Sequence, residues 1–107
     1  MFVASYDGKG WQDLKIVPYG DLSLSPALSA LHYGQAIFEG LKAYKSESGE
    51  ALVFRPVENL KRLNKSAERL CMPNLPEDIF MSGLTQLLSM DRDWIPSKPG
   101  YSLYIRG

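Results

Sequence analysis

The sequence predicts one small domain of mixed α and β structure, and three observations support this class. The chain has 107 residues, the size of a single domain. Hydrophobic residues make up 45% of it and charged residues 22%, as in ordinary globular proteins. Strand-like and helix-like patterns follow one another without an internal repeat or a low-complexity segment. We therefore expect residues 1–107 to form one domain of the α/β or α+β class.

The first predicted β-structure lies in the N-terminal half of the chain. Residues 11–24 mix apolar residues with Pro18, Gly20 and Asp21, which is typical of short extended pieces joined by a turn. Residues 37–44 and 51–54 are again apolar, and the intervening sequence SESGE is typical of a turn. These two runs predict a β-hairpin.

Two amphipathic helices are predicted next. The first begins at Pro56, a residue that a first helical turn tolerates, and ends near Pro73. Its apolar positions recur at steps of three and four, which is the spacing of one helix face: Val57, Leu60, Leu63, Ala67, Leu70 and Cys71. The second helix begins at residues 76–78 and extends to about Met90, although Gly83 weakens its pattern.

A final strand is predicted at residues 101–106. The alternation there puts Leu103 and Ile105 on one face and Tyr104 and Arg106 on the other. The predicted order is therefore strand, strand, helix, helix, strand. Because the last strand stops without a following turn or tail, we expect the chain to be truncated from a longer protein.

Charge and hydropathy argue against several classes of protein. Twelve basic and 12 acidic residues cancel, and neither sign forms a run that would indicate binding to nucleic acid or an anionic membrane. The segment MFVASYDGKGW lacks the basic region followed by an apolar region that is typical of a signal peptide, and no apolar stretch of about 18 residues occurs. Its single cysteine, Cys71, cannot form an internal disulfide. We expect a soluble, cytoplasmic protein with neither a nucleic-acid nor a membrane partner.

Motifs for several common chemistries are missing from the sequence. The single histidine, His32, has no second histidine or cysteine nearby, so a metal site would have no ligand set. There is no G-x-S-x-G nucleophile elbow, no G-x-G-x-x-G segment and no Walker lysine motif. We therefore expect no metal, no Ser-His-Asp triad and none of the usual nucleotide sites.

Polar side chains on the first helix and the last strand are candidates for a binding site. Four polar residues on the helix follow steps of three and four and lie opposite its apolar stripe: Asn59, Arg62, Ser66 and Arg69. Such a stripe is most often simply the solvated face. Tyr104 and Arg106 share one side of the strand, where a buried arginine would need an anionic partner. A surface pair on an edge strand fits these two residues equally well.

Four motifs give the chain a resemblance to a known family: LHYGQAIFEGLKAY, FRPVENLKRLNKSAERLCMP, DWIP and SLYIR. In this order and at this spacing they resemble branched-chain amino acid aminotransferases, which are class IV aminotransferases, over residues 22–106. The segments FEGLKAY and RPxxNxxRLxxSAxRLxxP are the most specific. The resemblance implies the small N-terminal domain of the fold-type IV pyridoxal phosphate fold, with antiparallel strands and two helices, cut off before the second domain.

The resemblance also implies an activity. Members of this family use pyridoxal 5'-phosphate as an electron sink and transfer an amino group between leucine, isoleucine or valine and 2-oxoglutarate, with glutamate as the counterpart amino acid. They act as homodimers whose active site lies between domains. One alternative is another class IV member, such as D-amino acid aminotransferase or aminodeoxychorismate lyase. A second alternative is a small binding module without catalysis.

Five residues match positions that form the active site in the family. Arg62 matches the arginine that binds the cofactor phosphate, a role that suits the planar fork of a guanidinium. Tyr33 and Phe38 match positions that line the substrate pocket, although aromatic residues more often serve in core packing. Tyr104 matches a tyrosine at the substrate α-carboxylate. Arg106 matches an arginine at the distal carboxylate of glutamate, helped by the Tyr33 hydroxyl.

No lysine of the chain matches the family's Schiff-base lysine, which is expected beyond residue 107. Lys42 belongs to the FEGLKAY motif, and we do not expect it to be catalytic. Transamination needs a lysine amine to hold the cofactor and to move the substrate α-proton. The 107 residues alone are therefore expected to be inactive.

Overall fold

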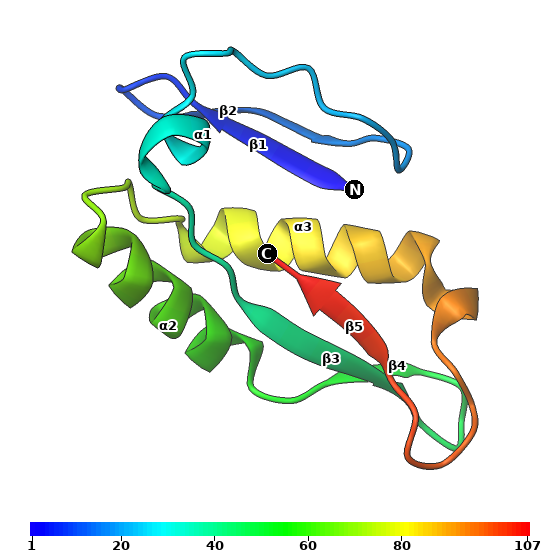
Figure 1. Ribbon diagram of the computed structural model, residues 1–107. Helices are drawn as coiled ribbons and strands as arrows, with labels where there is room; N and C mark the ends of the chain where they lie inside the picture. The colour runs from blue at the N-terminus through cyan, green and yellow to red at the C-terminus, as the bar shows by residue number, and fades with distance from the viewer.

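The computed structural model describes all of residues 1–107, which form two antiparallel sheets with helices packed against them (Figure 1). One sheet has two strands, and the other has three strands in the order β4-β3-β5. The strands are β1 (Phe2–Tyr6), β2 (Trp11–Ile16), β3 (Gly40–Lys45), β4 (Ala51–Val53) and β5 (Leu103–Arg106). The α+β class expected from the sequence is confirmed.

The helices include both of those predicted. They are α1 (Ser29–Tyr33), α2 (Pro56–Arg69), α3 (Glu77–Met90) and the 3-10 helix η1 (Arg92–Trp94). Helices α2 and α3 confirm the two predicted amphipathic helices, and β3 and β4 confirm the predicted hairpin. None of the helices has the length and apolar character that crossing a membrane would require.

The structure adds four elements to the predicted order, β1, β2, α1 and η1, of which β2 lies in the segment 11–24 where the sequence predicts short extended pieces. Strand β1 pairs with β2 across a turn in which Asp7 Oδ1 accepts backbone hydrogen bonds from Lys9 (2.8 Å) and Gly10 (2.9 Å). Most side chains of both strands are exposed or half-buried without strict alternation. The period-two pattern that identifies a strand is therefore weak there. Helices α1 and η1 are too short to show a helical period.

The hydrophobic core lies between β3 and α3. Its buried members are Leu41, Ala43, Leu84, Leu88 and Ile95. Leu103 and Ile105 of β5 pack against this cluster, whereas Tyr104 and Arg106 are exposed on the other face of the strand, as the alternation predicts. Burying each leucine or isoleucine contributes about 1.5–3 kcal/mol to folding. The core thus fixes which face of β5 is free to form a site.

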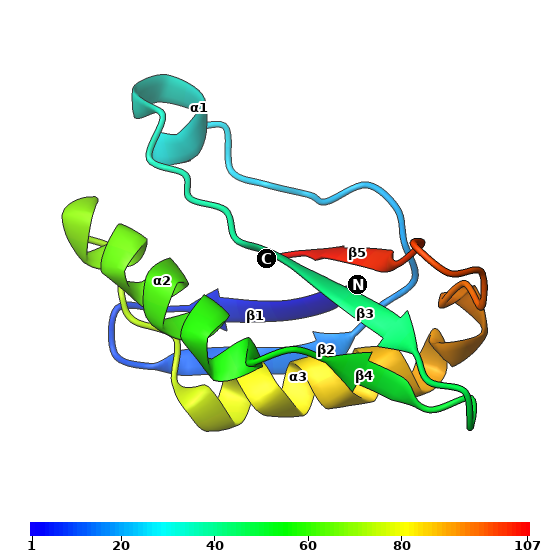
Figure 2. The same ribbon diagram turned by 90° about the horizontal axis from the view of Figure 1, so that it is seen from below.

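Helix α3 runs along one side of the molecule, with strands of both sheets above it (Figure 2). It meets β1 at Gly83, where an added Cβ would lie 2.5 Å from ring carbons of Phe2. The glycine that weakens the predicted helical pattern is therefore the point where the aromatic ring of β1 reaches the helix. The indole N–H of Trp11 in β2 also donates to the carbonyl of Asn74, just before α3 (2.8 Å).

The end of α2 is held by backbone hydrogen bonds from the two residues that follow Leu70. Cys71 donates to the carbonyl of Glu68 (3.2 Å) and Met72 donates to that of Ala67 (2.9 Å). This pairing is a Schellman motif, in which the residue at the Cys71 position adopts a left-handed conformation that favours glycine. Cys71 has a φ of 54° and therefore adopts this conformation with a side chain present.

We predict that Cys71→Gly raises the free energy of unfolding by about 1 kcal/mol, because the left-handed conformation costs a residue with a Cβ about that much. Chemical denaturation followed by circular dichroism measures the change. Cys71→Ala is the matched control and should give no comparable gain, since alanine keeps the Cβ. Equal stabilities for the two variants would contradict this explanation.

Candidate active site

The candidate site is centred on Gly40, at the start of β3. Gly40 lies opposite Arg106 in the pairing of β3 with β5, and Lys42 lies opposite Tyr104. These four residues share the face of the sheet that points away from the core. A Cβ at Gly40 would lie 2.6 Å from the Tyr104 hydroxyl oxygen. Only glycine at this position therefore lets the Tyr104 ring rest against β3.

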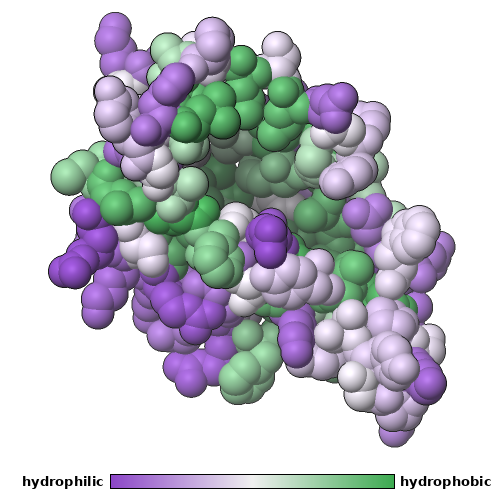
Figure 3. Space-filling model, viewed as in Figure 1, coloured by the Kyte–Doolittle hydropathy of each residue, from purple (hydrophilic) through white to green (hydrophobic).

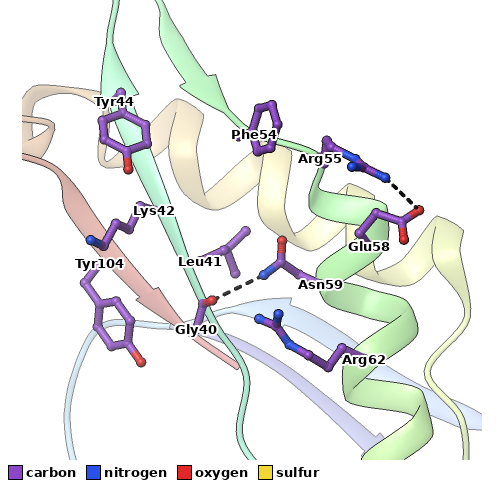
Figure 4. A pocket seen from close by; sticks show the side chains of 10 residues that line it. All are labelled: Gly40, Leu41, Lys42, Tyr44, Phe54, Arg55, Glu58, Asn59, Arg62 and Tyr104. Atoms are coloured by element: carbon purple, nitrogen blue, oxygen red, sulfur yellow. Dashed lines mark hydrogen bonds and ion pairs between the residues drawn. The ribbon is translucent and has the colours of Figure 1, made fainter.

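Two open cavities meet at this point, and both are lined by Gly40, Arg62 and Tyr104. The first has a volume of 440 Å³ and extends along β3 past Lys42. Figure 4 shows Arg62 of α2 and Tyr104 of β5 on either side of Gly40. The second cavity, of 400 Å³, is also lined by Phe38, Glu39 and Ser66.

Four of the five predicted site residues come together here. Phe38, Arg62 and Tyr104 line the second cavity. The guanidinium carbon of Arg106 lies 5.7 Å from the ring centre of Phe38 and 5.9 Å from that of Tyr104. Phe38 is 70% exposed, so in this chain it packs into no core and its ring is available to line a pocket.

Tyr33 is the predicted residue that the structure does not bring to this group. It is the last residue of α1 and is 87% exposed. Its ring neighbour is His32, with ring centres 6.4 Å apart, and the ring contacts of Arg106 do not involve it. Figure 2 shows α1 standing away from the three-stranded sheet. The expected action of Tyr33 together with Arg106 therefore stays a prediction.

Glu39 is the residue of this site that the sequence analysis does not single out. It directly precedes β3, and it is the one charged residue among the buried residues, with 5% of its surface exposed. The signal in the sequence is an acid inside the apolar run AIFEGL. A buried carboxylate needs hydrogen-bonding partners, because removing its charge from water costs several kcal/mol.

The partners of Glu39 come from α2 and from the first residue of β3. Arg62 donates two hydrogen bonds in a fork, from Nε to Oε2 at 2.6 Å and from Nη2 to Oε1. Asn59 Nδ2 donates to Oε1 at 3.1 Å, and the backbone N–H of Gly40 donates to the same oxygen at 3.0 Å. Asn59 and Arg62 belong to the polar stripe of α2. This half of the stripe therefore binds the sheet and is not merely a solvated face.

These contacts govern the ionisation of both members of the pair. The hydrogen bonds from Arg62 hold the pKa of the Glu39 carboxyl below its ordinary range, assisted by Asn59 and Gly40, although burial acts in the opposite direction. The same contact raises the pKa of Arg62. Glu39 is therefore a carboxylate and Arg62 a guanidinium cation at neutral pH.

The arrangement leaves Arg62 able to bind a second anion. A guanidinium has five N–H donors, of which two go to Glu39, so three remain without a partner in the protein. The side chain of Arg62 is 67% exposed and lines both cavities. Its free donors suit a phosphate or a carboxylate, because charge-assisted hydrogen bonds to these groups are strong.

The curated proteins that the chain resembles are named as aminotransferases or transaminases. The chain is 52% identical over 107 residues to branched-chain-amino-acid transaminase 1 of Bacillus subtilis. It is 56% identical over 108 residues to a probable branched-chain-amino-acid aminotransferase of Staphylococcus aureus. The match to the Mycolicibacterium smegmatis enzyme is 48% over 99 residues. No family model matches the chain.

All three relatives are named as branched-chain-amino-acid aminotransferases or transaminases. The resemblance expected from the sequence is therefore confirmed. The alignments to the B. subtilis and S. aureus proteins cover 99% and 98% of this chain but 30% of the length of each relative. The chain corresponds to an N-terminal portion of these enzymes.

We predict that Glu39 contributes stability at neutral pH that disappears in acid. Its pKa is lowered by folding, so its contribution is fully present above its ordinary pKa of about 4.3 and is lost as pH falls through the lowered value. The free energies of unfolding of the parent protein and of Glu39→Gln, measured from neutral pH to about pH 3, should therefore converge in acid. A constant difference over this range would contradict the prediction.

Proposed function

We propose that the protein containing this chain transfers amino groups between branched-chain amino acids (leucine, isoleucine and valine) and 2-oxoglutarate, with pyridoxal 5'-phosphate as cofactor. The names of relatives that are 48–56% identical to the chain support this proposal. The observation that carries it is Arg62, a cation with three free N–H donors beside an open cavity lined by Tyr104.

The residues present fit a cofactor of this kind. Arg62 would hold the phosphate through its free donors, since the other edge of its guanidinium is occupied by Glu39. When bound, pyridoxal phosphate supplies an electron sink that stabilises negative charge at the substrate α-carbon. In this proposal a lysine outside these 107 residues moves the α-proton, so Arg62 contributes binding and orientation rather than proton transfer.

The substrate end of the site would be formed by Phe38, Tyr104 and Arg106. In this proposal the Tyr104 hydroxyl binds the α-carboxylate that all the substrates share. Arg106 pairs with the distal carboxylate of glutamate, and the exposed ring of Phe38 offers an apolar wall to a branched side chain. A cation beside an aromatic wall would let one pocket accept both glutamate and leucine.

We also propose that the chain is the small N-terminal domain of a larger homodimeric enzyme. Only 10 of its 107 residues are buried, which is a small core for its length. Figure 3 shows apolar side chains gathered around a hollow on the face viewed in Figure 1. Such surface is normally covered by a partner. We place the enzyme in the cytoplasm, where the free Cys71 would stay reduced.

The proposed cofactor contact predicts that Arg62→Ala in the full-length enzyme weakens binding of pyridoxal 5'-phosphate by roughly tenfold to a hundredfold, the value of hydrogen bonds to a charged group. Absorbance titration measures the affinity. Arg69→Ala removes an exposed arginine of the same helix and should leave the affinity unchanged. Equal affinity of the Arg62→Ala variant and the parent would overturn the proposed phosphate contact.

The proposed substrate contact predicts that Arg106→Met lowers kcat/KM for glutamate roughly tenfold to a hundredfold and leaves leucine nearly unchanged. The reason is that only glutamate has a distal carboxylate. Tyr104→Phe is the matched comparison, and it should impair both substrates because both carry the α-carboxylate. Equal losses with leucine and glutamate in Arg106→Met would show that Arg106 acts on a group common to both.

A further inference from the structure

We propose that Glu39 is a positioning residue, which holds the Arg62 guanidinium so that its free N–H edge faces the cofactor phosphate. This inference rests on the proposed function, in which Arg62 binds that phosphate. It assigns a role to the buried acid of the site, which would not itself touch the cofactor or the substrate.

The two members of the pair have very different environments. The Glu39 side chain is 5% exposed and that of Arg62 is 67% exposed. An exposed arginine on a helix samples many rotamers, and its side chain loses rotamer entropy when it is fixed. The buried carboxylate removes much of that freedom before any ligand arrives, because it binds the guanidinium at two points. Arg62 is therefore ordered by the protein itself.

The geometry of the fork decides which donors remain. Glu39 occupies Nε and one N–H of Nη2, which leaves the second N–H of Nη2 and both N–H groups of Nη1. Because the guanidinium is planar and rigid, fixing one edge fixes the direction of the other. A lone point charge, such as a lysine ammonium, could not be aimed in this way.

The backbone of Glu39 is held in place by two hydrogen bonds to Gly107. Its N–H donates to the carbonyl of Gly107 (3.0 Å), and the N–H of Gly107 donates back to the carbonyl of Glu39 (2.9 Å). This pair extends the β3–β5 ladder by one residue beyond Arg106. Glu39 therefore connects Arg62 on α2 to the sheet that carries Tyr104 and Arg106. The Glu39 side chain thus connects Arg62, the proposed phosphate-binding residue, with the strand pair that carries the proposed carboxylate-binding residues.

The decisive experiment compares pyridoxal 5'-phosphate with pyridoxal, which lacks the phosphate, in absorbance titrations of the full-length protein. We expect Glu39→Gln to weaken binding of the phosphorylated cofactor about tenfold, because the second hydrogen bond of the fork is lost and Arg62 regains its freedom. Pyridoxal affinity should change little. Glu68→Gln, which changes an exposed acid on α2, the helix that carries Arg62, is the matched control and should behave like the parent.

A double-mutant cycle separates positioning from general damage. If Glu39 acts through Arg62, Glu39→Gln should cause no further loss of phosphate-specific affinity in an Arg62→Ala background. Additive losses, or an equal loss for pyridoxal, would overturn the proposal. Should Glu39→Gln fail to fold, Glu39→Asp provides the same readout, since it keeps the charge but withdraws the carboxylate by one methylene. Unchanged phosphate-specific affinity in Glu39→Asp would then overturn the proposal.

The outcomes also distinguish this inference from the proposed function. If Arg62→Ala binds pyridoxal 5'-phosphate as tightly as the parent, the proposed phosphate contact itself is wrong, and the inference is wrong with it. If Arg62→Ala loses affinity and Glu39→Gln does not, the proposed contact stands and only the positioning role of Glu39 is wrong.

Discussion

A single buried carboxylate, that of Glu39, joins helix α2 to the three-stranded sheet. Its charge is acceptable in the interior only because Arg62, Asn59 and the backbone of Gly40 donate to it. The same contacts set the position of α2 relative to the start of β3, where both cavities lie. The ion pair is thus a structural connection that also orients a guanidinium with free donors beside both cavities.

The pairing of β3 with β5 divides the sheet into a core face and a site face. Leu41 pairs with Ile105 toward α3, and the neighbouring pair of Gly40 with Arg106 lies on the opposite face. A slip of one residue would exchange the two faces, so burial of the core fixes the register of the site. Gly40 adds the second constraint, since it alone leaves room for the Tyr104 ring. Elementary packing therefore accounts for the grouping of Gly40, Tyr104 and Arg106 on one face.

The sequence predicts those features whose cause is local or periodic. Helices α2 and α3 are predictable because long amphipathic segments show a helical period, and β5 because it alternates. Strand β1 escapes prediction because its burial does not alternate, and because its contact with α3, Phe2 beside Gly83, joins distant parts of the chain. The role of Glu39 escapes for a similar reason. Its partners Asn59 and Arg62 lie 20 and 23 residues away in sequence. The acid inside the apolar run AIFEGL therefore stands out locally, but nothing local shows which residues pair with it.

We propose that Arg62, oriented by Glu39, is the phosphate-binding group of an aminotransferase site. The most direct measurement is a crystal structure of the full-length protein with pyridoxal 5'-phosphate bound. We expect a phosphate oxygen within about 3 Å of a free Nη donor of Arg62, with the fork to Glu39 intact. A phosphate held elsewhere in the protein, without contact to Arg62, would contradict the account.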